Sequence, residues 1–150
     1  MLPSSARRLC LPREWFIALG ILLLVTLALQ APYALGYLTA PRDTFYTGLL
    51  VNVEDANYIT IIQRGSQGAW THSLRFTSEP DAPAFLYVFY LALGHLARVV
   101  HLDATAMWHL ARAGLTLLCF GVVFGFTGNF FRAALPRWTA FLVTIFGAGF

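Results

Sequence analysis

The chain has 150 residues, of which 58% are hydrophobic and 11% are charged, and its net charge at pH 7 is +3. A soluble domain has roughly 45–50% apolar and about 25% charged residues, so this composition argues against a water-soluble globular protein and against a disordered one. The small net charge also argues against a nucleic-acid-binding protein. The two cysteines, Cys10 and Cys119, have no spacing typical of a zinc site or a disulfide framework.

The first apolar segment predicts a membrane-spanning helix at residues 15–34. No charged residue occurs between Glu14 and Arg42, and a helix needs roughly 20 residues to cross a hydrocarbon layer of about 30 Å. Three arginines lie in residues 1–14, so we expect this segment to stay in the cytoplasm. A cleaved secretory signal is the alternative, but its apolar region is usually only about 7–15 residues long.

Three further apolar segments follow in the second half of the chain. Residues 82–100 and 104–131 predict two more complete crossings, with Asp81 and Asp103 as N-terminal caps. Residues 138–150 are still apolar where the sequence stops, so they predict the beginning of a fourth crossing in a chain that breaks off early.

Residues 35–81 form the predicted extracytoplasmic loop if the first helix runs outward, the second inward and the third outward again. The arginines do not test this topology, because five fall on each side. The loop contains five of the seven acidic residues, and a connection of this length rarely lacks secondary structure. We predict short helices on the membrane surface, the clearest at residues 53–64, with Asn52 at its start and Gly65 as its stop.

An acid and a phenol share one face of this predicted surface helix. Glu54 and Tyr58 are four residues apart and are therefore neighbours, whereas Asp55 points about 100° away. The alternative is that both carboxylates only favour the positive end of the helix dipole.

Aromatic and basic residues beyond this pair have two interpretations each. Trp70, Tyr87 and Tyr90 either stack on a sugar or prenyl chain or belong to the aromatic belt of the membrane interface. The repeat His-Leu-Ala-Arg, at residues 95–98 and 109–112, either binds a lipid phosphate or anchors helix ends at the cytoplasmic surface.

Two short motifs resemble the start of the GT-C membrane glycosyltransferases, a superfamily that includes the dolichyl-phosphate-mannose protein mannosyltransferases. They are Glu-Asp-Ala-Asn-Tyr at residues 54–58, in the loop after the first helix, and Glu-Pro-Asp-Ala-Pro at residues 79–83, at the entry to the second predicted crossing. The resemblance covers about residues 46–100. It implies a catalytic acid in the first outside loop and a sugar donor attached to a polyprenyl phosphate or pyrophosphate.

The resemblance also implies roles for individual residues. A carboxylate acts as general base on the acceptor hydroxyl, and Glu54 is the expected base because its distance from Tyr58 matches the family spacing. Asp55 is the alternative, since the family more often has Asp before Glu. Tyr58 is expected to bind substrate.

The phosphate leaving group needs cations or a metal. Arg64 and Arg75 are expected to bind it through paired hydrogen bonds, with contacts to lipid headgroups as the alternative. Glu79 is either a second acid at the site or a residue at the start of a helix. No cofactor and no metal site are predicted with named ligands, and a divalent metal is an open alternative.

The sequence therefore predicts an all-α integral protein of the plasma (inner) membrane, with three complete transmembrane helices, part of a fourth and a large outside loop of short interfacial helices. Its expected function is that of the N-terminal portion of a membrane glycosyltransferase, and its expected partners are membrane lipid and a polyprenyl-linked sugar donor, not nucleic acid. The alternative is a non-catalytic accessory subunit, bound to another membrane protein, or a truncated relic of such an enzyme.

Overall fold

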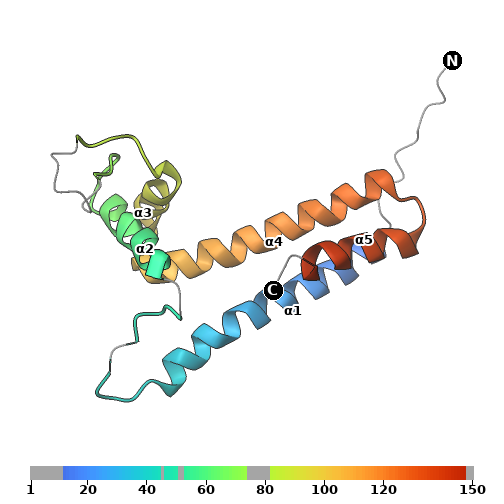
Figure 1. The fold of residues 1–150 in the computed structure, drawn as a ribbon, viewed down its shortest axis with the longest axis horizontal. Coiled ribbons are helices and arrows are strands. Elements are labelled where there is room, and N and C mark those ends of the chain that lie inside the picture. The colour runs from blue at the N-terminus through green and yellow to red at the C-terminus, as the bar shows by residue number, and fades with distance from the viewer. Residues whose placement is uncertain (1–11, 45, 51–52, 74–81, 148–150) are drawn as a thin grey trace. The chain divides into compact units, whose positions relative to one another are not determined.

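The computed structural model describes residues 12–44, 46–50, 53–73 and 82–147 (Figure 1). In these ranges the chain forms helices and no strand, and one isolated antiparallel bridge joins His72 to Ala84. The all-α prediction is thereby confirmed for the described residues. The helices are α1 (Pro12–Thr39), α2 (Val53–Ser66), α3 (Val88–Val100), α4 (Ala104–Phe130) and α5 (Ala134–Phe146).

Two of these helices are long and apolar enough to cross a membrane. They are the segments Arg13–Thr39 and Ala104–Phe130, with 27 residues each, and a helix of that length is about 40 Å long. Large apolar side chains on both are exposed, including Phe16 of α1 and Phe130 of α4, as expected for surfaces that face lipid. The predicted cap of α4 is confirmed, because Asp103 Oδ1 accepts the N–H of Ala106 at 2.9 Å.

The predicted crossing at residues 82–100 is not confirmed as a complete span. Its helical part, α3, has 13 residues, which corresponds to about 20 Å. The helix begins after Tyr87, whose φ is 56°, so the predicted cap at Asp81 is wrong. The N–H and C=O of Ala84 both bond to the backbone of His72, at 3.0 and 2.9 Å, and this pairing keeps the preceding stretch out of the helix.

The helix α5 also has 13 residues and begins four residues earlier than predicted. Its predicted end at residues 148–150 lies outside the described residues.

By its internal contacts the chain divides into two compact units, described separately here. Unit 1 comprises Met1–Leu29 and Gly114–Phe150, and unit 2 comprises Gln30–Ala113. The helices α1 and α4 each contribute one end to each unit.

The core of unit 1 is aromatic. Phe124 of α4 and Phe141 of α5 are fully buried, together with Ala18 and Leu22 of α1. The ring centroid of Phe124 lies 5.1 Å from those of both Trp15 and Phe141, in edge-to-face geometry, which favours a specific packing of the three helices.

Unit 1 also contains a nearly buried ion pair between α1 and α5. Arg137 Nη2 donates to Glu14 Oε1 at 3.1 Å, and the two side chains are 8% and 13% exposed. The predicted topology places Glu14 inside and Arg137 outside. In that topology three crossings separate the two residues.

Removal of one partner from this ion pair is expected to destabilise unit 1. Glu14→Gln leaves the Arg137 guanidinium without its carboxylate, which typically costs about 3–5 kcal/mol for a buried pair. We expect a lower midpoint of thermal unfolding in detergent, partly restored by the double variant Glu14→Arg/Arg137→Glu. The exposed Asp43→Asn is the control, and an unchanged midpoint in Glu14→Gln would contradict a stabilising role of the pair.

In unit 2, α2 and α3 approach each other closely at two glycines (Figure 1). A Cβ atom on Gly65 would overlap the carbonyl group of Leu91, and one on Gly94 would overlap the carbonyl oxygen of Ile62. Only glycine permits this backbone distance. Ile61, Ile62 and Leu91 are fully buried.

The stop of α2 differs from the prediction. Gly65 lies inside the helix, where the contact with α3 requires it, and the turn is made by Gly68 with a φ of 100°. The N–H of Gly68 bonds to Gly65 O at 2.9 Å, and the N–H of Ala69 bonds to Arg64 O at 3.1 Å. This is a Schellman motif, for which glycine is the usual residue.

The last turns of α1 lie beside the first turns of α4 in unit 2. Gln30 Nε2 donates to His109 O at 3.1 Å, and Arg112 Nη2 donates to Gln30 Oε1 at 2.6 Å. The Arg112 guanidinium also lies 4.1 Å from the ring centroid of Tyr33. The predicted topology places these two helix ends on opposite sides of the membrane.

Candidate functional site

The candidate site is centred on α2, which matches the surface helix predicted at residues 53–64. The structure describes the side chains of Asp55, Tyr58 and Arg64, and for Glu54 it describes only the position on the helix. Arg75 and Glu79, and the predicted start at Asn52, lie outside the described residues. As predicted, Glu54 and Tyr58 are one helical turn apart.

Tyr58 is half-buried between aromatic rings of α3 and α4. Its ring centroid lies 4.5 Å from that of Tyr90 of α3 and 5.7 Å from that of Trp108 of α4, with interplanar angles of 20° and 24°. Tyr87 and His72 extend this cluster, with ring centroids 5.4 Å apart. The packing fixes α2 against α3 and α4, so Tyr58 has a structural role whether or not it contacts a substrate.

Asp55 is half-buried on α2 near this aromatic cluster. Burial raises the pKa of Tyr90 above its usual value, and the neighbouring Tyr58 and the charge of Asp55 raise it further. The Tyr90 phenol therefore stays protonated at neutral pH and can donate a hydrogen bond.

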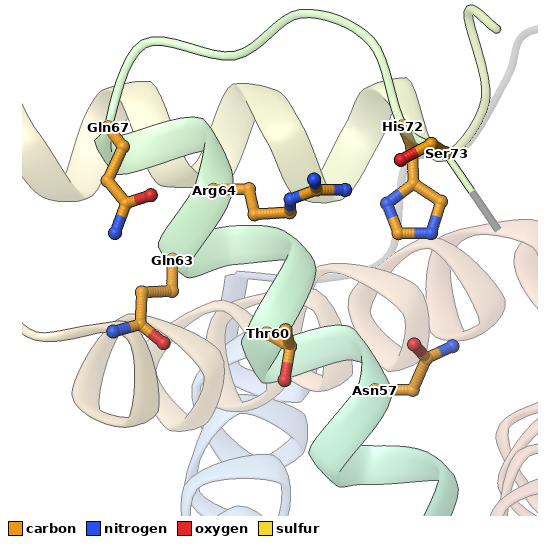
Figure 2. Close-up of a pocket in the computed structure, with 7 residues that line it drawn as sticks. All are labelled: Asn57, Thr60, Gln63, Arg64, Gln67, His72 and Ser73. Atoms are coloured by element: carbon orange, nitrogen blue, oxygen red, sulfur yellow. The ribbon is translucent and has the colours of Figure 1, made fainter. Parts of the chain in front are cut away.

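The structure does not bring Arg64 to the face of Asp55 and Tyr58. Arg64 follows Asp55 by nine positions, which places it about 180° around the helix. It instead lines an open pocket of about 250 Å³ (Figure 2). The lining residues are Asn57, Thr60, Gln63, Arg64 and Gln67 of α2, with His72 and Ser73 of the segment that follows.

Sequence reasoning missed this pocket, although its α2 residues carry a detectable signal. Positions 57, 60, 63, 64 and 67 recur at helical spacing and are all polar. No sequence pattern indicates that His72 lines the pocket, because its position depends on the backbone bridge to Ala84.

Trp70, one of the aromatic residues predicted to stack on a ligand, contacts another ring of the protein. Trp70 stacks on the ring of His95 at a centroid distance of 4.1 Å, while half of its surface stays exposed. His95 Nε2 donates to Ala69 O at 3.2 Å. The first His-Leu-Ala-Arg copy therefore supports the segment after α2.

The second His-Leu-Ala-Arg copy joins α4 to α1 and to the loop between α1 and α2. His109 Nε2 donates to Gly48 O at 2.9 Å, and its ring lies 4.8 Å from that of Tyr33. Together with the contacts of Arg112 to Gln30 and Tyr33, these interactions give this copy a structural role in joining the helices. The sequence did not predict that role.

Within the described ranges, no group of three or more His, Cys, Asp or Glu side chains is arranged to hold a metal ion. Arg64 is the predicted phosphate ligand whose position is known, and it lies on the far side of α2 from Asp55. Asp55 and Arg64 are thus on opposite faces of the same helix, whereas Glu54 is about 80° from Arg64 around the helix and about 15 Å from it along the axis.

Comparison with known protein families, with curated proteins and with solved structures finds no match to this chain.

Proposed function

We propose that this chain is the membrane-embedded part of an enzyme that transfers a sugar from a polyprenyl-linked donor to an acceptor hydroxyl at the outer membrane surface, with Glu54 as general base. The observation that carries the proposal is the composition of unit 2. It combines the acidic start of α2 with the ends of two helices long enough to cross a membrane. The likeness of residues 54–58 to the GT-C pattern supports the same assignment.

The chemistry requires this combination. A polyprenyl chain holds its sugar phosphate at the lipid–water interface, so the base has to be fixed at that level. Binding the acceptor hydroxyl within hydrogen-bond reach of a carboxylate lets the proton leave as the hydroxyl attacks the anomeric carbon. A short helix packed against the ends of transmembrane helices holds a carboxylate at that depth.

The proposed topology has two crossings before α5 and replaces the three-crossing arrangement. The helix α1 runs outward from a cytoplasmic N-terminus in the plasma (inner) membrane, α4 returns, and the segment between them, including α2 and α3, is extracytoplasmic. The pair Glu14–Arg137 in unit 1 and the contact of Gln30 with Arg112 in unit 2 each support it. Five arginines then lie inside, four outside and one within α4, a small bias in the expected direction.

The exposed face of α3 supports its place on the membrane surface. Leu91, Gly94 and Ala97 are buried on one side of the helix. Phe89, Leu96 and Val99 are exposed on the other, and such an apolar face is typical of an interfacial helix.

Cysteine labelling in intact cells distinguishes the two topologies. In a background of Cys10→Ser and Cys119→Ser, we expect Leu102→Cys, between α3 and α4, to react with a membrane-impermeant maleimide. Asp43→Cys is the outside control, and Ala133→Cys, between α4 and α5, is the inside control that reacts only after permeabilisation. Labelling of Leu102→Cys only after permeabilisation would restore α3 as a crossing and refute the proposed topology.

The activity itself is tested in membranes that contain the protein in its full natural reading frame. We expect radiolabelled sugar to be transferred from at least one of three synthetic donors, polyprenyl-phosphate mannose, glucose or arabinose, with release of polyprenyl phosphate. Absence of transfer from all three would contradict the proposal and would favour the non-catalytic accessory subunit.

A further inference from the structure

The open pocket lies on a face of α2 that is turned away from Asp55. Its main wall follows three turns of the helix, and Figure 2 shows the Arg64 side chain directed along the helix toward His72, between the two walls. Since Arg64 and Asp55 are about 180° apart around α2, a ligand here would not contact the carboxylate of Asp55.

The second wall is held by defined backbone interactions. The turn at Gly68, with a φ of 100°, reverses the chain after α2. His72 is then fixed by two backbone hydrogen bonds to Ala84, at 2.9 and 3.0 Å, and is 6% exposed. The pocket is therefore formed in the folded chain and does not need a ligand to organise it.

The lining is rich in groups that both donate and accept hydrogen bonds. Asn57, Gln63 and Gln67 supply three carboxamides, and Thr60 and Ser73 supply two hydroxyl groups. The Thr60 hydroxyl donates to Ala56 O at 2.8 Å, which leaves its oxygen as an acceptor. None of the seven lining side chains is aliphatic or carboxylic, and the aromatic one is the polar imidazole of His72. Such a set suits adjacent hydroxyl groups of a sugar, which need both donors and acceptors.

The electrostatics of the pocket favour an anion. Arg64 carries the permanent positive charge of the lining and is half-buried. In the described part of the chain, the structure contains one ion pair, between Glu14 and Arg137. No described carboxylate therefore neutralises the charge of Arg64. A guanidinium in this setting binds a carboxylate or phosphate through two parallel hydrogen bonds.

We propose that this pocket binds an acidic saccharide, with its hydroxyl groups on the carboxamides of α2 and its anionic group on Arg64. The volume is below the roughly 300 Å³ at which pockets for drug-sized ligands begin, which limits the bound part to about one sugar unit. The proposal does not rest on the transfer reaction, because it is tested by binding of a saccharide and not by transfer.

The test measures binding of methyl β-glucuronide to the purified full chain in detergent, by ligand-observed NMR titration. We expect saturable binding, and Arg64→Gln should raise the dissociation constant at least about tenfold, since it removes a charge-assisted contact. Gln63→Ala, at an exposed position, should weaken binding by a smaller factor. Arg42→Gln, which removes an exposed arginine outside the pocket, is the matched control and should leave the dissociation constant unchanged.

Two comparison ligands separate the parts of the proposal. Methyl β-glucoside, which lacks the carboxylate, should bind native protein more weakly than the glucuronide and should be insensitive to Arg64→Gln. Inorganic phosphate should compete only weakly, since it lacks the sugar hydroxyl groups. Equal binding of phosphate and glucuronide would reduce the pocket to a simple anion site, and absence of saturable glucuronide binding, or equal binding by Arg64→Gln, would overturn the proposal.

Discussion

Glu54→Gln is expected to lower the rate of sugar transfer by about 10²–10⁴-fold, the range typical for loss of a general base. The substitution keeps the size and the helix propensity of the side chain, and residue 54 is the second position of α2, one turn before Tyr58. The rate is measured with the donor that the native protein accepts. Donor binding should change little, because the proton leaves the acceptor and not the donor.

Asp55→Asn is the matched control for this experiment. It removes a neighbouring carboxylate that points about 100° away from Glu54 on the helix, and we expect it to reduce transfer less than tenfold. Since the charge of Asp55 contributes to the raised pKa of Tyr90, Asp55→Asn should also bring that pKa closer to its usual value. Full transfer by Glu54→Gln together with loss of transfer by Asp55→Asn would exchange the roles of the two acids.

Gly94→Ala is expected to destabilise unit 2 by about 3 kcal/mol, toward the upper end of the range for overpacked positions. Its Cβ would overlap the carbonyl oxygen of Ile62 and the backbone of Gly65, and neither backbone group can turn aside as a flexible side chain would. The helices α2 and α3 must then move apart. The midpoint of thermal unfolding should fall, and the near-ultraviolet circular dichroism from the stacked rings of Tyr58 and Tyr90 should weaken.

Gly114→Ala provides the control for Gly94→Ala. No atom lies within 4 Å of a Cβ placed on Gly114 of α4, so alanine should leave stability unchanged or raise it by roughly 0.5–1 kcal/mol through its better helix propensity. Equal effects of the two substitutions would show that the close approach of α2 and α3 does not stabilise unit 2.

Local sequence patterns predicted the elements that depend on local interactions. The two long apolar segments, the helix at α2 and the cap of α4 by Asp103 are all found at or near their expected residues. The start of α3 was predicted too early, because apolar composition does not reveal that the backbone of Ala84 pairs with His72. The stop of α2 was assigned to Gly65 instead of Gly68, because sequence does not distinguish a glycine required by packing from one required by a turn.

In the candidate site, too, some features could be predicted from the sequence and others could not. The spacing of Glu54, Asp55 and Tyr58 on one helix could be predicted, since helical geometry fixes it. The enclosure of Tyr58 by Tyr90 and Trp108 could not, because these rings come from two other helices. Arg64 and Asp55 lie on opposite faces of α2 because the helix continues unbroken through residue 64, as predicted.

The sequence by itself determined that this chain is helical and apolar, with two segments of membrane-spanning length and an acidic segment between them, because hydropathy and helical periodicity are properties of neighbouring residues. Only the tertiary structure decided how the segments are paired. Glu14 bonds to Arg137 across 123 positions, and Gln30 bonds to Arg112 across 82. Each pairing depends on how two helices pack against each other, and residues that far apart in sequence leave no local pattern from which their contact can be inferred.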